Sequence, residues 1–162
     1  MVFVTFKGAG VDQRIAQFVT AESCEQFALN VQDREPEAAS EARRRAVELR
    51  AAAHGATTAA ERESLEAVYA YEAARSVGRN RRFRASRTWQ MIRERGILPA
   101  VENVVARPRD SAGYRALVEA GMLDKAFEAV VLRHPEAFST DAVERSKKRM
   151  AGGHPDSDGE AR

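Results

Sequence analysis

Cysteine, proline and aromatic residues are scarce in this sequence, and each shortage excludes a class of protein. The single cysteine, Cys24, cannot form an intramolecular disulfide, so the chain is not a small domain held together by disulfides. No apolar run approaches the roughly 20 residues that a membrane-spanning helix needs. The first ten residues, MVFVTFKGAG, lack the basic start and long apolar stretch of a secretory signal. We therefore expect a cytoplasmic protein with no membrane partner.

Signatures of metal binding and of catalysis are also missing from the sequence. The histidines, His54, His134 and His154, have no second histidine or cysteine at a ligand spacing. The GAG at residues 8–10 lacks the third glycine and the lysine of a phosphate-binding loop. A lone cysteine in a helix is ordinarily a small buried hydrophobic residue. We therefore expect no metal, no cofactor and no catalytic residue. A catalytic site whose residues meet only in the folded chain, around His134 or Cys24, stays open as a third hypothesis.

Helix-favouring residues dominate what is present. Alanine and arginine are abundant, and β-branched residues are sparse beyond the first twenty positions. Apolar residues recur at helical spacing, and the Thr58 and Glu61 pair has the spacing of a capping box. Ser139 fits an N-cap, with Phe138 and Val143 placed as a hydrophobic staple. These patterns predict helices at residues 20–33, 36–54, 58–77, 86–95, 98–106, 111–120, 122–134 and 139–150.

The two ends of the chain lack this pattern. Residues 2–6, VFVTF, and 14–19, RIAQFV, favour short strands, and the glycines between them favour a turn. Residues 151–162 are polar with glycine and proline, which predicts a disordered tail. We therefore predict a mainly α protein, a compact multi-helix single domain with a short N-terminal β-hairpin and a disordered C-terminal tail. Its parts would be a hairpin and first helix packed on the main body (1–33), the helical body (34–150) and the tail (151–162).

Positive charge is concentrated in one short stretch. The net charge of the whole chain is only +2, but residues 75–95 contain eight arginines and a single acid, Glu94. This stretch therefore carries +7, and the rest of the chain carries −5. Arginine keeps its charge at any ordinary pH and offers a planar, forked donor to phosphate oxygens. A local field of this kind indicates an anionic partner.

From this charge we predict a non-catalytic nucleic-acid-binding protein that uses residues 79–95, the basic segment. Residues 79–84 would form a flexible arm, and residues 86–95 a short helix. The arm would contact phosphates through Arg79, Arg81, Arg82 and Arg84. The helix would present Arg87, Gln90 and Arg93 to a groove or to the backbone, because arginine and glutamine can read guanine and adenine edges. The sequence does not distinguish DNA from RNA.

Two alternatives use the same residues. An adaptor or regulatory protein would bind an acidic protein partner through the basic segment, or the arginines would be neutralised by carboxylates of the chain itself. The spacing is also wrong for a helix-turn-helix, because eight or more residues separate the helix ending at Val77 from the helix at Ser86. Trp89 shares a helix face with Ile92 and is expected in the core, whereas Phe83 either anchors the arm or touches a base. An unpaired strand edge in the hairpin would offer a route to a homodimer.

Overall fold

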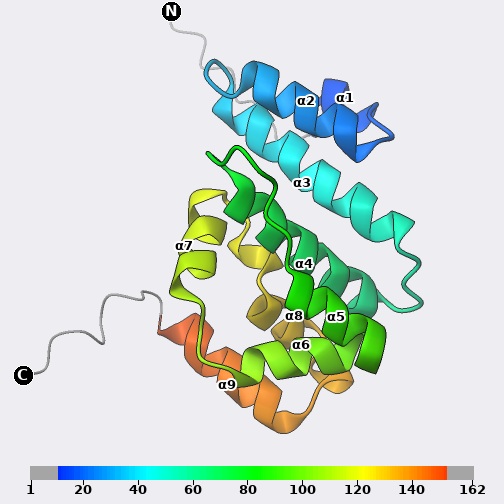
Figure 1. Ribbon diagram of the computed structural model, residues 1–162, viewed down its shortest axis with the longest axis vertical. Helices are drawn as coiled ribbons and strands as arrows, with labels where there is room; N and C mark the ends of the chain where they lie inside the picture. Colours follow the sequence, from blue (N-terminus) through cyan, green and yellow to red (C-terminus); the bar gives the residue numbers. More distant parts are fainter. Residues whose placement is uncertain (1–10, 153–162) are drawn as a thin grey trace, which may run out of the picture. The chain divides into compact units, whose positions relative to one another are not determined.

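The computed structural model describes residues 11–152, and every regular element in that part of the chain is a helix (Figure 1). The helical character is therefore as predicted. The chain divides into two compact units, and the boundary between them falls inside one helix, between Leu49 and Arg50. Within the described residues, no helix combines the length and the apolar character that crossing a membrane requires.

The first unit contains three helices around a small apolar core. These are α1 (Gln13–Ala16), α2 (Ala21–Val31) and the first part of α3 (Pro36–Ala53). Thr20 caps α2 by accepting a hydrogen bond from the backbone N–H of Ser23. The core forms because each helix contributes small or branched side chains at helical spacing. Its buried residues are Ile15, Ala28, Val31, Ala39 and Ala42.

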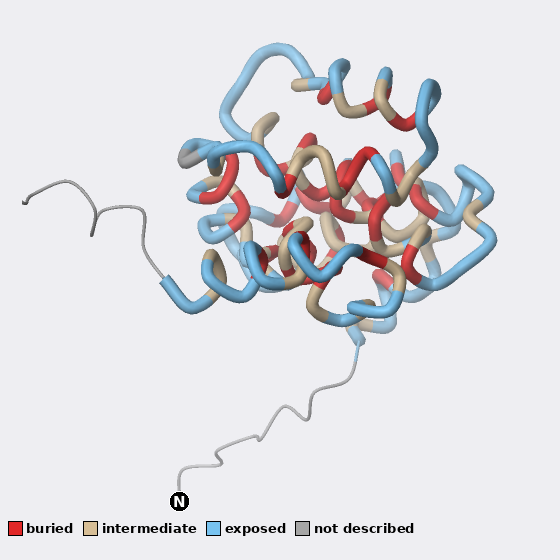
Figure 2. Tube along the Cα trace, turned by 90° about the horizontal axis from the view of Figure 1, so that it is seen from below, coloured by how far each residue is buried: buried red, intermediate tan, exposed pale blue. Residues whose placement is uncertain are grey.

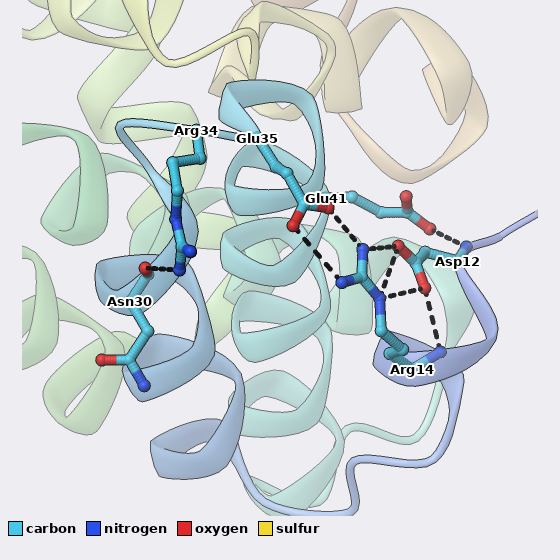
Figure 3. A network of polar contacts seen from close by, with 6 residues as sticks. All are labelled: Asp12, Arg14, Asn30, Arg34, Glu35 and Glu41. Atoms are coloured by element: carbon cyan, nitrogen blue, oxygen red, sulfur yellow. Dashed lines mark hydrogen bonds and ion pairs between the residues drawn. The ribbon is translucent and has the colours of Figure 1, made fainter.

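The predicted β-hairpin is wrong, because the segment assigned to its second strand begins as a helix. Asp12 caps α1 by accepting a hydrogen bond from the N–H of Arg14. The Arg14 guanidinium then bridges Asp12 and Glu35 at 2.7 and 2.6 Å, as Figure 3 shows. A short apolar run cannot by itself distinguish a strand from a helical turn, and here the cap and the burial of Ile15 favour the turn. The first predicted strand, residues 2–6, lies outside the described residues.

The second unit is built around α4 (Ala59–Ser76), which packs against α6, α7 and α8. Its other helices are α5 (Ser86–Arg95), α6 (Ile97–Ala106), α7 (Ser111–Glu119), α8 (Phe127–Arg133) and α9 (Thr140–Ala151), with short 3-10 helices η1 (Leu123–Lys125) and η2 (Pro135–Ala137). One side of α4 joins Trp89 and Ile92 of α5 in an apolar cluster, and Ala67 joins valines of α6 and α8 in another. Buried positions accordingly recur along these helices, between exposed turns (Figure 2).

The predicted helix ends are accurate where a capping side chain marks them. Thr58 and Glu61 form the capping box, and Ser139 caps α9 by accepting from the N–H of Ala142. The predicted helix at 122–134 is wrong as one element, because Ala126 is extended, with ψ 151°, and separates η1 from α8. This break accompanies the burial of Lys125, whose Nζ lies 2.8 Å from Glu66 Oε2. The tail was predicted to begin at Ala151, but this residue is the last one of α9. Residues 153–162 of the predicted tail lie outside the described residues.

Candidate nucleic-acid interface

The basic segment is fixed to α4 by a buried carboxylate. Glu72 is 3% exposed, and its Oε1 accepts hydrogen bonds from the backbone N–H of Ala85 at 2.8 Å and from Trp89 Nε1 at 2.6 Å. One turn further along α4, the Ser76 hydroxyl accepts from the N–H of Phe83 at 2.9 Å. Buried polar groups are costly unless paired, so these bonds set the course of the chain from Phe83 into α5.

Aromatic side chains strengthen this anchor. The Phe83 ring meets Tyr71 edge to face, with ring centroids 5.4 Å apart, and the Arg75 guanidinium lies 4.8 Å above Phe83. Phe83 therefore anchors the arm, which was one of the two roles predicted for it. Trp89 is 5% exposed and stacks on His54 at 5.1 Å, so its predicted place in the core is confirmed. The arm is attached at its C-terminal end and is not a free tail.

The predicted binding residues lie at the surface. All seven, Arg79, Arg81, Arg82, Arg84, Arg87, Gln90 and Arg93, are exposed. Within residues 11–152, five of them make no side-chain hydrogen bond and no ion pair with a carboxylate: Arg79, Arg81, Arg84, Arg87 and Arg93. Their positive charge is therefore not neutralised by the described carboxylates at contact distance.

On α5 the exposed residues form an arc beside the buried face. Helical spacing places Arg87 and Gln90 on the far side of the helix from Trp89 and Ile92, which are buried, whereas Arg93 follows Trp89 by one turn and is exposed at the edge of the buried face. Glu94 shares the exposed arc, and its Oε1 accepts a hydrogen bond from Gln90 Nε2 at 2.8 Å. Gln90 would have to give up this bond to read a base, whereas the two arginines are available as they stand.

A cavity of about 510 Å³ opens beside the arm, entirely within the second unit. Its walls come from Tyr71 of α4, the arm, the first turns of α5, the ends of α6 and α9, the loop at 107–110, α7 and α8. Apolar and aromatic lining residues include Phe83, Met91, Val104, Tyr114 and Phe127. Charged lining residues are Arg84, Arg87, Arg107, Arg109, Arg149, Asp110 and Glu128. The lining therefore carries three more positive than negative charges.

Three of the lining arginines are free to meet a ligand. Arg84 and Arg87 are unpaired, as described above, and the Arg107 guanidinium has only a distant contact with Met91 Sδ, at 3.9 Å. The other two have partners. Arg149 pairs with Glu128 at 3.1 Å, and Arg109 lies 4.3 Å above the Tyr114 ring and donates to the backbone carbonyl of Arg149.

One wall of the cavity is organised around Asp110. Its Oδ2 accepts from the Tyr71 hydroxyl at 2.6 Å and pairs with Arg75 at 2.9 Å, while Oδ1 caps α7 through the N–H of Ala112. Gly113 is buried against this group, and a Cβ there would meet Asp110 Oδ2 at 2.9 Å and press into the Tyr71 ring. Only glycine allows this close approach without moving the wall.

The pKa values of Tyr71 and Asp110 shift in opposite directions. Burial, together with the hydrogen bond to Asp110 and the charge of Asp110, raises the pKa of Tyr71 to about 12. Burial also acts to raise the pKa of Asp110, but the Tyr71 hydroxyl, two backbone amides and Arg75 outweigh it and hold that pKa below its ordinary value. The carboxylate therefore stays ionised and the phenol neutral over the ordinary pH range.

We predict that the folded protein loses stability as pH rises from about 10 to about 12. A phenol whose pKa is raised by folding stabilises the folded state below its unfolded pKa of 10.0, and this contribution disappears as pH passes the folded value. Urea unfolding at several pH values would measure the decrease. The Tyr71→Phe variant lacks the group and should show a smaller decrease. An equal decrease in both proteins would contradict the assignment.

Glu72 and the part of the cavity lining beyond the basic segment were not predicted from the sequence. Glu72 lies one turn after Val68 on the buried face of α4, and a buried tryptophan needs a partner for its N–H. Those two facts together could have singled out a carboxylate on that face. No sequence signal could have joined Arg107 and Arg149 to the arm, because only the packing of α6, α7 and α9 brings them there.

Cys24 and His134, the residues named for the third hypothesis, belong to different units of the described chain. Cys24 is buried in the first unit, and burial raises the pKa of its thiol, which lowers its reactivity. In the second unit, His134 Nε2 lies 3.1 Å from Glu63, which also pairs with Arg133 at 2.7 Å. Among residues 11–152, no three histidine, cysteine, aspartate or glutamate side chains gather to hold a metal ion.

Comparison with known proteins gives no family to set beside this geometry. No protein-family model, no curated protein and no solved structure matches the chain.

Proposed function

We propose that this protein binds nucleic acid through its basic segment, without catalysis. The observation that carries the proposal is the group of exposed arginines, Arg79, Arg81, Arg84, Arg87 and Arg93, which have no carboxylate partner within residues 11–152. Guanidinium groups left in this state suit phosphate oxygens, which they bind through paired hydrogen bonds. Arg82 belongs to the same exposed stretch. A cytoplasmic location accords with the single cysteine and is part of the proposal.

The fixed course of the segment also supports this function. Bonds from Ser76 and Glu72 hold Phe83 and Ala85, so Arg84 and Arg87 project from a backbone that is already in place. The exposed arc of α5 continues the positive surface through Arg93. Phosphate contacts position a protein on nucleic acid without reading its sequence, so we propose binding with little base specificity.

Salt dependence tests the proposal directly. If about five phosphates are neutralised, the slope of log K against log salt should be about −4, so affinity should fall roughly 250-fold between about 50 and 200 mM salt. Fluorescence anisotropy with a labelled single strand and a labelled duplex measures this. If the anisotropy of neither probe changes when protein is added at about 50 mM salt, the proposal is refuted. A partner retained from an extract after nuclease treatment would then favour the acidic protein.

A further inference from the structure

The arginine-lined cavity has the size and the mixed character of a small-molecule site. Sites of this kind are typically about 300–1,000 Å³, mostly apolar, with a few polar groups that orient the ligand. Here the apolar part comes from Phe83, Met91, Val104 and Phe127, and the cations without a carboxylate partner are Arg84, Arg87 and Arg107. An apolar wall with free guanidinium groups suits a ligand that joins a flat, weakly polar ring to a phosphate.

The cavity is continuous with the predicted nucleic-acid surface. Arg84 and Arg87 belong to both, since they are exposed residues of the basic segment and also line the cavity. A strand whose phosphates follow the arm would therefore reach the cavity without leaving its positive surface. Thr88 on α5 and the carboxylates of Asp110 and Glu128 add hydrogen-bonding groups to the lining.

We propose that the cavity accepts one unstacked nucleotide, with its base against the apolar wall and its phosphate at Arg84, Arg87 and Arg107. This inference rests on the proposed function and specifies it. The bases of a duplex are stacked and paired, so only a single strand, or a free mononucleotide with the same chemistry, can place a base there. The protein would therefore bind a single strand more tightly than a duplex of equal length.

Two variants separate the cavity from the arm. Val104→Trp fills the cavity from α6 and leaves every arginine in place, and Arg107→Ala removes a cavity cation that lies outside the basic segment. Arg115→Ala is the matched control, because Arg115 is an exposed arginine on α7 that does not line the cavity. Circular dichroism and urea unfolding check that the tryptophan variant folds. If it does not fold, Arg107→Ala carries the test.

Fluorescence anisotropy measures the affinity for a labelled single strand of about 12 nucleotides and for a duplex of the same length. Adenosine monophosphate is added as an unlabelled competitor. We expect the single strand to bind about tenfold more tightly than the duplex, and each cavity variant to reduce single-strand affinity about tenfold. Duplex affinity and the Arg115→Ala control should change less than about twofold. Competition by the mononucleotide that is lost in the cavity variants would identify a free nucleotide as the source of the ligand.

The failures of the two proposals are distinguishable. Equal single-strand and duplex affinity, with no effect of either cavity variant, would overturn the cavity proposal and leave the arm proposal standing. Binding of adenosine monophosphate without binding of either polymer would overturn the arm proposal and support the cavity. The absence of binding by all three probes would overturn both.

Discussion

Replacing Arg81, Arg84 and Arg87 together with alanine should weaken nucleic-acid binding at about 50 mM salt by a factor on the order of hundreds. Each phosphate contact contributes about 0.7–0.9 to the slope of log K against log salt, so the slope should also become shallower by about 2 to 3. Both effects follow because the affinity of such a surface comes mainly from the counterions that its arginines release. Anisotropy titrations at several salt concentrations measure both quantities.

The control for this triple variant must remove the same charge elsewhere. Arg62 on α4, Arg115 on α7 and Lys148 on α9 are exposed and lie outside the basic segment, so their joint replacement with alanine lowers the net charge by the same three units. We expect the control to keep most of its affinity for nucleic acid. In both triple variants, each replaced residue should change the free energy of unfolding by no more than about 0.5 kcal/mol. If the two triple variants bind equally, binding depends on net charge and not on the basic segment.

Replacing Glu72 with alanine should lower the free energy of unfolding by about 3 kcal/mol. The change leaves two buried donors, the backbone N–H of Ala85 and Trp89 Nε1, without an acceptor. Each unpaired donor costs about 1–3 kcal/mol, and relief from burying a carboxylate offsets part of the sum. Urea unfolding measures the loss, and the fluorescence of Trp89 should shift to longer wavelength as water reaches the indole.

Glu72→Gln supplies the matched comparison because it keeps an oxygen of the same reach. We expect it to lose only about 1 kcal/mol, since a neutral acceptor replaces a charged one. Glu94→Ala, at an exposed carboxylate on α5, should stay within about 0.5 kcal/mol of the parent. An unfolding midpoint for Glu72→Ala equal to that of the parent would show that the two donors find other partners.

The sequence predicted the helices of the second unit well wherever an amphipathic period met a recognisable cap. Thr58 and Ser139 are such caps, and the helices that they begin were placed within a residue or so. The predictions were wrong where tertiary contacts, and not the local sequence, determine the backbone conformation. The apolar run after Asp12 suited a strand as well as a helical turn, and the break at Ala126 accompanies the burial of Lys125 beside Glu66.

The candidate site shows the same division between local and tertiary information. The exposure of Arg79, Arg81 and Arg93 follows from local pattern, since they fall off every apolar stripe. Whether carboxylates of the chain neutralise them depends on packing, which the sequence alone did not reveal. The cavity is a tertiary feature throughout, because its walls come from six helices, the arm and the loop between α6 and α7.

The attachment of the arm to α4 affects how fast a ligand binds and how tightly it is held. A loose tail of arginines would have to give up backbone entropy when it met a phosphate, at a cost of about 1–2 kcal/mol for each residue ordered. Here Ser76 and Glu72 impose that order during folding, so the arginines beyond Phe83 are preorganised. Contact with an anion would then require only the rearrangement of side chains.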